Sequence, residues 1–107
     1  MNEDTATQTS TYRNHPINDY RSVLPADGQL IDVREAAEVR SGSLPGAVNI
    51  PVGQLVGRVH ELDRTRPVAL FCRSGARSAA AAEYLAANGF STVVNLAGGM
   101  LAYSQSQ

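Results

Sequence analysis

The fold is decided by a stretch in the second half of the chain, Pro67-Val68-Ala69-Leu70-Phe71-Cys72-Arg73-Ser74-Gly75-Ala76-Arg77. It starts with a short apolar run, which predicts a buried strand over 68–71, and the alanine-rich residues 78–87 after it predict a helix. The loop between them contains the only cysteine of the chain. A strand, a loop and a helix in this order point the N–H groups of the loop and of the first helical turn at one spot. We expect Cys72 to lie at the rim of the site that these groups form.

Cys72 is predicted to be a reactive nucleophile. A lone cysteine is most often a small buried hydrophobe, but this one follows the end of a strand and has Arg73 and Arg77 close by in the sequence. The helix N-terminus and the two guanidinium groups favour the thiolate and so lower the pKa of the thiol. The residues expected to bind an anionic substrate beside the sulfur are Arg73, Ser74, Gly75, Ala76, Arg77 and Ser78.

The composition is that of one ordinary globular domain. The chain has 107 residues, of which 43% are hydrophobic, and a formal net charge of -1. Such a charge gives no general attraction to nucleic acid or to an anionic membrane. All nine basic residues are arginine, which excludes a lysine Schiff base, a pyridoxal phosphate anchor and a Walker A loop. A single cysteine also excludes an internal disulfide and a multi-cysteine metal cluster.

The chain is predicted to consist of a flexible polar lead over residues 1–13 and a single domain over residues 14–107. The first eleven residues are polar and acidic, unlike a secretory signal or a transit peptide. No apolar run approaches the ~20 residues that a membrane helix needs. We therefore expect a cytoplasmic protein, a monomer or weak dimer, that binds neither nucleic acid nor a membrane.

Strand and helix patterns alternate along the chain. After a weak helical pattern over 16–24, strands are predicted at 29–33, 47–50, 68–71 and 92–96, with no clear strand before the first of them. Helices are predicted at 34–40, 52–62, 78–87 and 100–103. This alternation predicts an α/β fold with three α/β/α layers around a parallel sheet of four to five strands. Such sheets bind ligands beyond the carboxyl ends of their strands, which is where Cys72 lies.

Four short motifs, in order, resemble a single rhodanese-like domain from Leu30 to about Tyr103. The resemblance implies a five-stranded parallel sheet with strand order 3-2-4-5-1, and sulfur transfer through a persulfide on Cys72. Ser43 and Tyr103 depart from the His and Trp that are common in the family. The motifs are Ile31-Asp32-Val33-Arg34-Glu35 with Glu38, Leu44-Pro45-Gly46-Ala47-Val48-Asn49-Ile50-Pro51, the loop Cys72 to Ser78, and Asn95-Leu96-Ala97-Gly98-Gly99-Met100.

The resemblance implies a sulfurtransferase that needs no metal and no organic cofactor. A loop of the form Cys-Arg-Ser-Gly-x-Arg is similar to that of thiosulfate sulfurtransferases, whereas a Cys-Gly-Ser-Gly-Val loop is associated with mercaptopyruvate. The expected donor is a small anion such as thiosulfate, whose oxygens the loop amides and the arginines can hold. The expected acceptor is a thiol, cyanide or a protein that takes up the sulfur.

Two charged residues before the loop are second choices for the site. Asp32 ends the strand that the family topology places beside the strand of the cysteine, so its carboxylate could orient Arg73, Arg77 or the loop backbone. It could equally be a helix cap or part of a structural ion pair. Arg34 could widen the positive rim of the site, or it could form a surface ion pair with Glu38.

Two other functions stay open. Rhodanese-like domains also serve as docking or regulatory modules without catalysis, although such a copy is expected to lack the cysteine. Phosphatases and arsenate reductases also place a cysteine and an arginine on a loop before a helix, with five residues between them. Here four residues intervene, and the smaller ring of amides suits one sulfur atom better than a phosphate. His15 and His60 are expected to be surface residues outside the chemistry.

Overall fold

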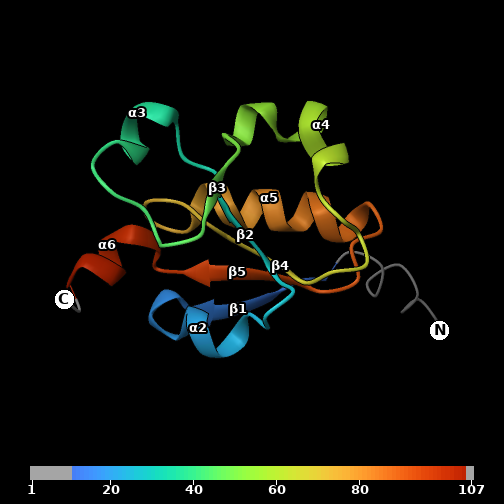
Figure 1. The fold of residues 1–107 in the computed structure, drawn as a ribbon, viewed down its shortest axis with the longest axis horizontal. Helices are drawn as coiled ribbons and strands as arrows, with labels where there is room; N and C mark the ends of the chain where they lie inside the picture. Colours follow the sequence, from blue (N-terminus) through green and yellow to red (C-terminus); the bar gives the residue numbers. More distant parts are fainter. Residues whose placement is uncertain (1–10, 106–107) are drawn as a thin grey trace.

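The chain forms a five-stranded parallel sheet with helices on both faces (Figure 1). The computed structural model describes residues 11–105, so the first ten residues of the predicted lead lie outside the described residues. The order β1-β5-β4-β2-β3 across the sheet confirms the predicted order 3-2-4-5-1. The strands are β1 (Arg13–Pro16), β2 (Gln29–Asp32), β3 (Val48–Asn49), β4 (Val68–Phe71) and β5 (Val93–Ala97).

The edge strand β1 corrects the expectation that no strand precedes residue 29. Its four residues pair in parallel with β5, with Arg13 opposite Val94. The strand is polar and has a neighbour on one side only, so it lacks the apolar alternation that marks a half-buried strand. It also spans the predicted boundary between residues 13 and 14. The expected helical pattern over 16–24 is a 3-10 turn, η1 (Ile17–Asp19), followed by the short helix α2 (Tyr20–Val23).

The other helices lie where the sequence predicts them, with different lengths. They are α3 (Ala36–Val39), α4 (Leu55–Arg58), α5 (Ala76–Ala87) and α6 (Gly99–Gln105). The single helix predicted over 52–62 is divided into η2 (Val52–Gln54), α4 and η3 (Val59–Glu61); two glycines in this stretch lower its helix propensity. None of the helices within residues 11–105 combines the length and the apolar character needed to cross a bilayer.

The core has two parts, one on each face of the sheet. Successive residues of β4 point to opposite faces, so Val68 and Leu70 pack with α4 and α5, whereas Ala69 and Phe71 pack with α2 and α6. The small alanine side chains of α5 let that helix lie close to the sheet. Cys72 continues the alternation and belongs to the core cluster on the α5 face, at the carboxyl end of β4.

Candidate active site

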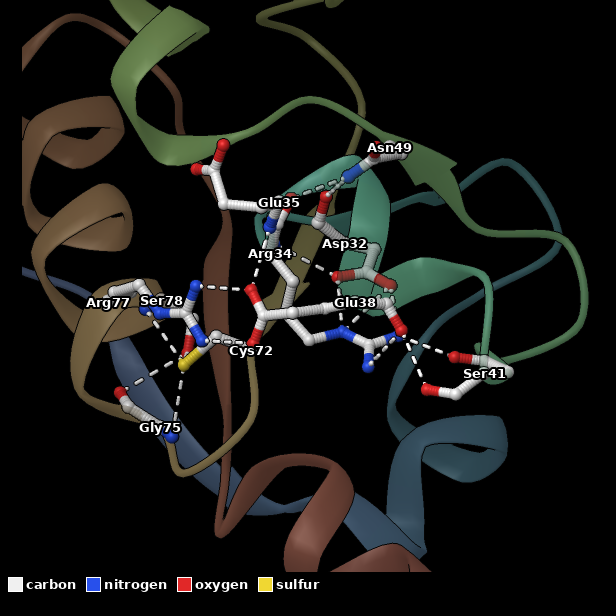
Figure 2. Close-up of polar contacts among 11 residues, drawn as sticks. Asp32, Arg34, Glu35, Glu38, Ser41, Asn49, Cys72, Gly75, Arg77 and Ser78 are labelled. Carbon is white, nitrogen blue, oxygen red and sulfur yellow. Dashed lines mark hydrogen bonds and ion pairs between the residues drawn. The ribbon is translucent and has the colours of Figure 1, made fainter.

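The loop after β4 curls around the sulfur of Cys72 (Figure 2). The N–H of Gly75 donates to Sγ at 3.1 Å, the N–H of Ser78 donates to it at 3.4 Å, and Ser78 Oγ lies 3.5 Å from it. The turn requires glycine, because Gly75 has φ 108° and a Cβ there would meet the N of Gly98 at 3.3 Å. Donors from the loop and from the first turn of α5 therefore meet at one atom.

Cys72 lies at the floor of the loop and has an exposed fraction of 0%. The expectation that it sits at the rim is therefore wrong. The alternation of β4 turns the side chain towards α5, where it packs in one cluster with Leu70 and Ala82. The sulfur is closed to solvent, but it is not in a purely apolar environment, because peptide and hydroxyl donors surround it.

The pKa of the Cys72 thiol is nevertheless below its ordinary value. Burial acts to raise it, but hydrogen bonds from the Ser78 hydroxyl and from the N–H groups of Ser78, Gly75 and Ser74 outweigh that effect. Each of these donors interacts more strongly with a thiolate than with a thiol. The loop therefore favours the ionised, nucleophilic form of the sulfur.

Arg77 is paired with a carboxylate to which the sequence analysis did not connect it. Its Nη1 and Nη2 donate to Glu38 Oε1 and Oε2 at 2.7 and 2.9 Å, across 39 residues of sequence. The hydrogen bond from Arg77, with a second one from the N–H of Glu35, lowers the pKa of the Glu38 carboxyl to about 2. The same bond raises the pKa of Arg77 above its ordinary value. Arg77, in the first turn of α5, is therefore already paired with a carboxylate of the protein.

Arg73, Ser74 and Ala76 are exposed on the outside of the loop. Within residues 11–105, Arg73 has no ion-pair partner. Its side chain borders a hollow of about 230 Å³ beside the loop, which we call the side hollow. The rest of its wall is formed by Arg34, Glu38, Met100, Leu101 and the turn after α3.

Asp32 and Arg34 form a buried ion pair next to the loop. Asp32 accepts the Nε and Nη2 groups of Arg34 at 2.9 and 2.7 Å, and Ser43 Oγ donates to it at 2.8 Å. Arg34 also donates to the carbonyl oxygens of Glu38 and Gly42. The geometry is that of a structural ion pair: among the described residues no hydrogen bond or ion pair joins Asp32 to Arg73 or Arg77, and the ion-pair partner of Arg34 is Asp32, not Glu38.

Asn95 is a buried polar residue that the sequence analysis did not connect with the thiol. It accepts the Ser78 hydroxyl at 2.6 Å, and its Nδ2 donates to Asn14 Oδ1 at 2.9 Å. The sequence did contain a signal for its role, because Asn95 is an amide side chain within the otherwise apolar strand β5. A buried polar side chain needs hydrogen-bond partners. The sequence showed Ser43 only as a departure from the family pattern. In the structure its hydroxyl donates a hydrogen bond to Asp32.

The described residues offer no metal site: no three His, Cys, Asp or Glu side chains between residues 11 and 105 come together. His60 is exposed on η3 and His15 is half-buried in β1. Neither is among the groups that hydrogen-bond to the sulfur, which belong to Ser74, Gly75 and Ser78. The groups that do contact the sulfur are peptide N–H groups and a hydroxyl, which suit a thiolate.

Known proteins resemble this chain over most of its length. The family model described as rhodanese-like domain matches residues 17–106. A sulfurtransferase of Allochromatium vinosum is 39% identical over 79 residues, which cover 74% of each protein. The thiosulfate sulfurtransferase GlpE of Shewanella oneidensis is 29% identical over 97 residues, covering 90% of this chain and 96% of that protein. A rhodanese-like domain protein from Staphylococcus aureus superposes with a TM-score of 0.77 at 29% identity, covering 85% and 90% of the two chains.

Proposed function

The chain belongs to the rhodanese-like domain family, and on that basis we propose that it transfers sulfane sulfur through a persulfide on Cys72. The observation that carries this proposal is the set of hydrogen bonds that end on Sγ, from the N–H groups of Gly75 and Ser78 and from the Ser78 hydroxyl. Donors in this position stabilise the thiolate before the reaction and the persulfide anion after it. The relatives named above support sulfurtransferase activity.

The proposed donor is thiosulfate or a similar small anion. The Cys72 thiolate attacks the terminal sulfur of thiosulfate, the S–S bond of the donor breaks, and sulfite leaves with the bonding electron pair. Cys72 then carries a persulfide anion, and an acceptor thiolate or cyanide removes the outer sulfur and regenerates the thiolate. The name of the Shewanella relative supports thiosulfate. We place the reaction in the cytoplasm, where a free cysteine is kept reduced.

Access to the sulfur requires side chains around the loop to move, because Cys72 has no exposed surface. The Arg77 and Glu38 side chains are 35% and 31% exposed, and Arg73 is exposed, so we expect these three to open the way to the sulfur. The closed thiol also favours the second candidate, a docking module that performs no transfer. That candidate does not explain why so many donors converge on the sulfur.

Measurement of the intact mass separates the two functions. After incubation with thiosulfate, we expect the wild-type protein to gain the mass of one sulfur atom and to lose it on addition of dithiothreitol. The Cys72→Ala variant should gain nothing, and circular dichroism would verify its fold. If the folded wild-type protein takes up no sulfur from thiosulfate, from a thiosulfonate or from a polysulfide, the docking module is correct and the sulfurtransferase proposal fails.

A further inference from the structure

We propose that Glu38 sets the donor specificity of this site: thiosulfate remains a donor, but the carboxylate disfavours its second charge relative to a singly charged sulfane donor that carries an organic group. The inference rests on the proposed sulfur transfer at Cys72. Two separate features support it. One is the charge balance of the loop mouth, by which we mean the side chains of Arg73, Arg77 and Glu38; Figure 2 shows the pair of Arg77 and Glu38. The other is the side hollow.

The loop mouth contains little uncompensated positive charge. Both terminal amino groups of Arg77 donate to Glu38, and Arg34 is neutralised by the buried carboxylate of Asp32. Among residues 11–105, Arg73 is left as the arginine of the loop mouth without a carboxylate partner. The two negative charges of a dianion that approaches a thiolate need more positive charge than one guanidinium supplies. The single charge of a monoanion is balanced by one guanidinium.

Glu38 acts directly against a second negative charge. A donor that uses Arg77 must displace the carboxylate from both nitrogens, and a donor that binds beside the pair remains close to that carboxylate. In either case each unit of donor charge is repelled by Glu38, which at about 4 Å in a solvated site lowers binding about fivefold per charge. The penalty is therefore larger for thiosulfate than for a donor with one charge.

The side hollow combines charged and polar groups with one apolar wall, which gives the organic group of a donor a surface to contact. Met100 and Leu101 give it an apolar wall, and Leu101 is 40% exposed, one of three large hydrophobic side chains that are exposed within residues 11–105. This wall is attached to the loop, because the N–H of Met100 donates to Cys72 O at 2.9 Å and the N–H of Leu101 donates to Arg73 O at 3.0 Å. Binding sites for organic ligands combine such apolar walls with a few charged groups.

Thiosulfonates represent the proposed donor class and allow a matched comparison with thiosulfate. They carry an organic group in place of one charged oxygen, and so have one negative charge. The Cys72 thiolate attacks their terminal sulfur, the new S–S bond forms, the S–S bond of the donor breaks, and a sulfinate leaves with the electron pair. One thiolate and one thiosulfonate thus give one persulfide anion and one sulfinate, with the charge balanced.

The charge argument is tested by Glu38→Gln with Glu61→Gln as its control. The first variant removes the charge but keeps the amide oxygen that can accept the N–H of Glu35. The second removes an exposed carboxylate that is paired with Arg58 at 2.9 Å, on a different element. We expect Glu38→Gln to raise the ratio of kcat/KM for thiosulfate over benzenethiosulfonate about fivefold and Glu61→Gln to leave it unchanged. An unchanged ratio in Glu38→Gln overturns the inference.

Protection of Cys72 from iodoacetamide supplies a second measurement that needs no sulfur transfer. Benzenesulfonate and sulfate are unreactive analogues with one and two charges. We expect benzenesulfonate to protect the wild-type thiol at lower concentration than sulfate, and Glu38→Gln to improve protection by sulfate more than by benzenesulfonate. If no donor forms a persulfide, the proposed function fails, and this assay still decides the role of Glu38. Equal effects of the variant on both anions contradict that role.

The apolar wall is tested by Leu101→Ser with Val56→Ser as its control. Val56 is also exposed, at 63%, but lies on α4. We expect Leu101→Ser to lower the preference for benzenethiosulfonate over methanethiosulfonate about threefold to fivefold, because the phenyl group loses apolar contact. Val56→Ser should leave the preference unchanged. If Leu101→Ser also leaves it unchanged, the organic group does not lie in the side hollow.

Discussion

Ser78 Oγ lies 2.6 Å from Asn95 Oδ1 but 3.5 Å from Cys72 Sγ. A hydroxyl has one proton, so the amide oxygen of Asn95 competes with the sulfur for it. The carbonyl oxygen of Gly75, at 3.2 Å, is a third acceptor. Because Asn95 also donates to Asn14 on β1, a chain of hydrogen bonds connects the edge of the sheet with the thiol.

Replacement of Asn95 by leucine is expected to lower the pKa of the Cys72 thiol further. Without the competing oxygen, the Ser78 hydroxyl donates to the sulfur and stabilises the thiolate. Ser78→Ala removes that donor and should raise the pKa. The pH dependence of alkylation by iodoacetamide measures both effects, and Asn14→Ala, at an exposed position beyond Asn95, should change the midpoint little. A midpoint that stays the same or rises in Asn95→Leu would show that Asn95 does not compete for the proton.

Asp32→Asn is expected to lower the free energy of unfolding by about 3 kcal/mol, because it leaves the buried guanidinium of Arg34 without a counter-charge. Both residues are almost fully buried. Urea unfolding at pH 7 measures the change, and Glu61→Gln, in an exposed pair, should change stability little if at all. Below its unfolding transition the Asp32→Asn variant should still form the persulfide. Loss of the persulfide in a folded variant would instead assign Asp32 a role in positioning the loop.

Gly99→Ala is expected to destabilise the fold by about 3 kcal/mol and to slow persulfide formation. Gly99 has φ 59°, and a Cβ there would overlap the carbonyl oxygen of Arg73. The backbone of the loop must shift to accept it, which moves the donors around the sulfur. Gly53→Ala is the matched control, because no atom lies within 4 Å of its added Cβ. Equal stability and equal persulfide rates in the two variants would contradict this close approach.

The sequence predicted the central strands and the loop because their signals are local. The strand β4 is an apolar run, β2 and β5 each contain a pair of adjacent apolar residues, and the glycine before α5 marks the turn that brings N–H groups to the sulfur. The edge strand β1 was missed, because Arg13–Pro16 is polar and takes part in the sheet only through pairing with β5. Its formation depends on a partner 81 residues away, as the contact between Asn14 and Asn95 illustrates.

The contacts that define the electrostatics of the site could not be predicted from sequence spacing. Glu38 and Arg77 lie on different helices and meet only when the sheet is assembled. The burial of Cys72 follows from the alternation of side chains along β4, which turns residues 68, 70 and 72 to the same face. It could have been deduced from that alternation, but the rim position was expected because Cys72 begins the loop. For Asn95, the polar residue inside a buried strand is visible in the sequence. Its partner Ser78 is not, because the two meet only in the folded protein.

The ion pair between Glu38 and Arg77 is expected to contribute to stability at neutral pH and to be lost in acid. The pKa of Glu38 falls from its ordinary 4.5 to about 2 in the folded protein. Because the folded value is the lower one, the contribution is complete above about pH 4.5 and disappears as the pH falls towards 2. Since about a third of the Glu38 side chain is exposed, we expect a contribution of about 1 kcal/mol.

Urea unfolding of the wild-type protein and of Glu38→Gln over this pH range measures that contribution. The wild-type protein should be the more stable of the two at pH 7, and the two curves should converge as the pH falls through about 2, because the carboxyl then takes up its proton and becomes uncharged like the amide. If the difference remains constant from pH 7 to pH 2, the stabilisation comes from packing or from the hydrogen bond to the N–H of Glu35. The charge of Glu38 would then matter less at the loop mouth than its geometry indicates.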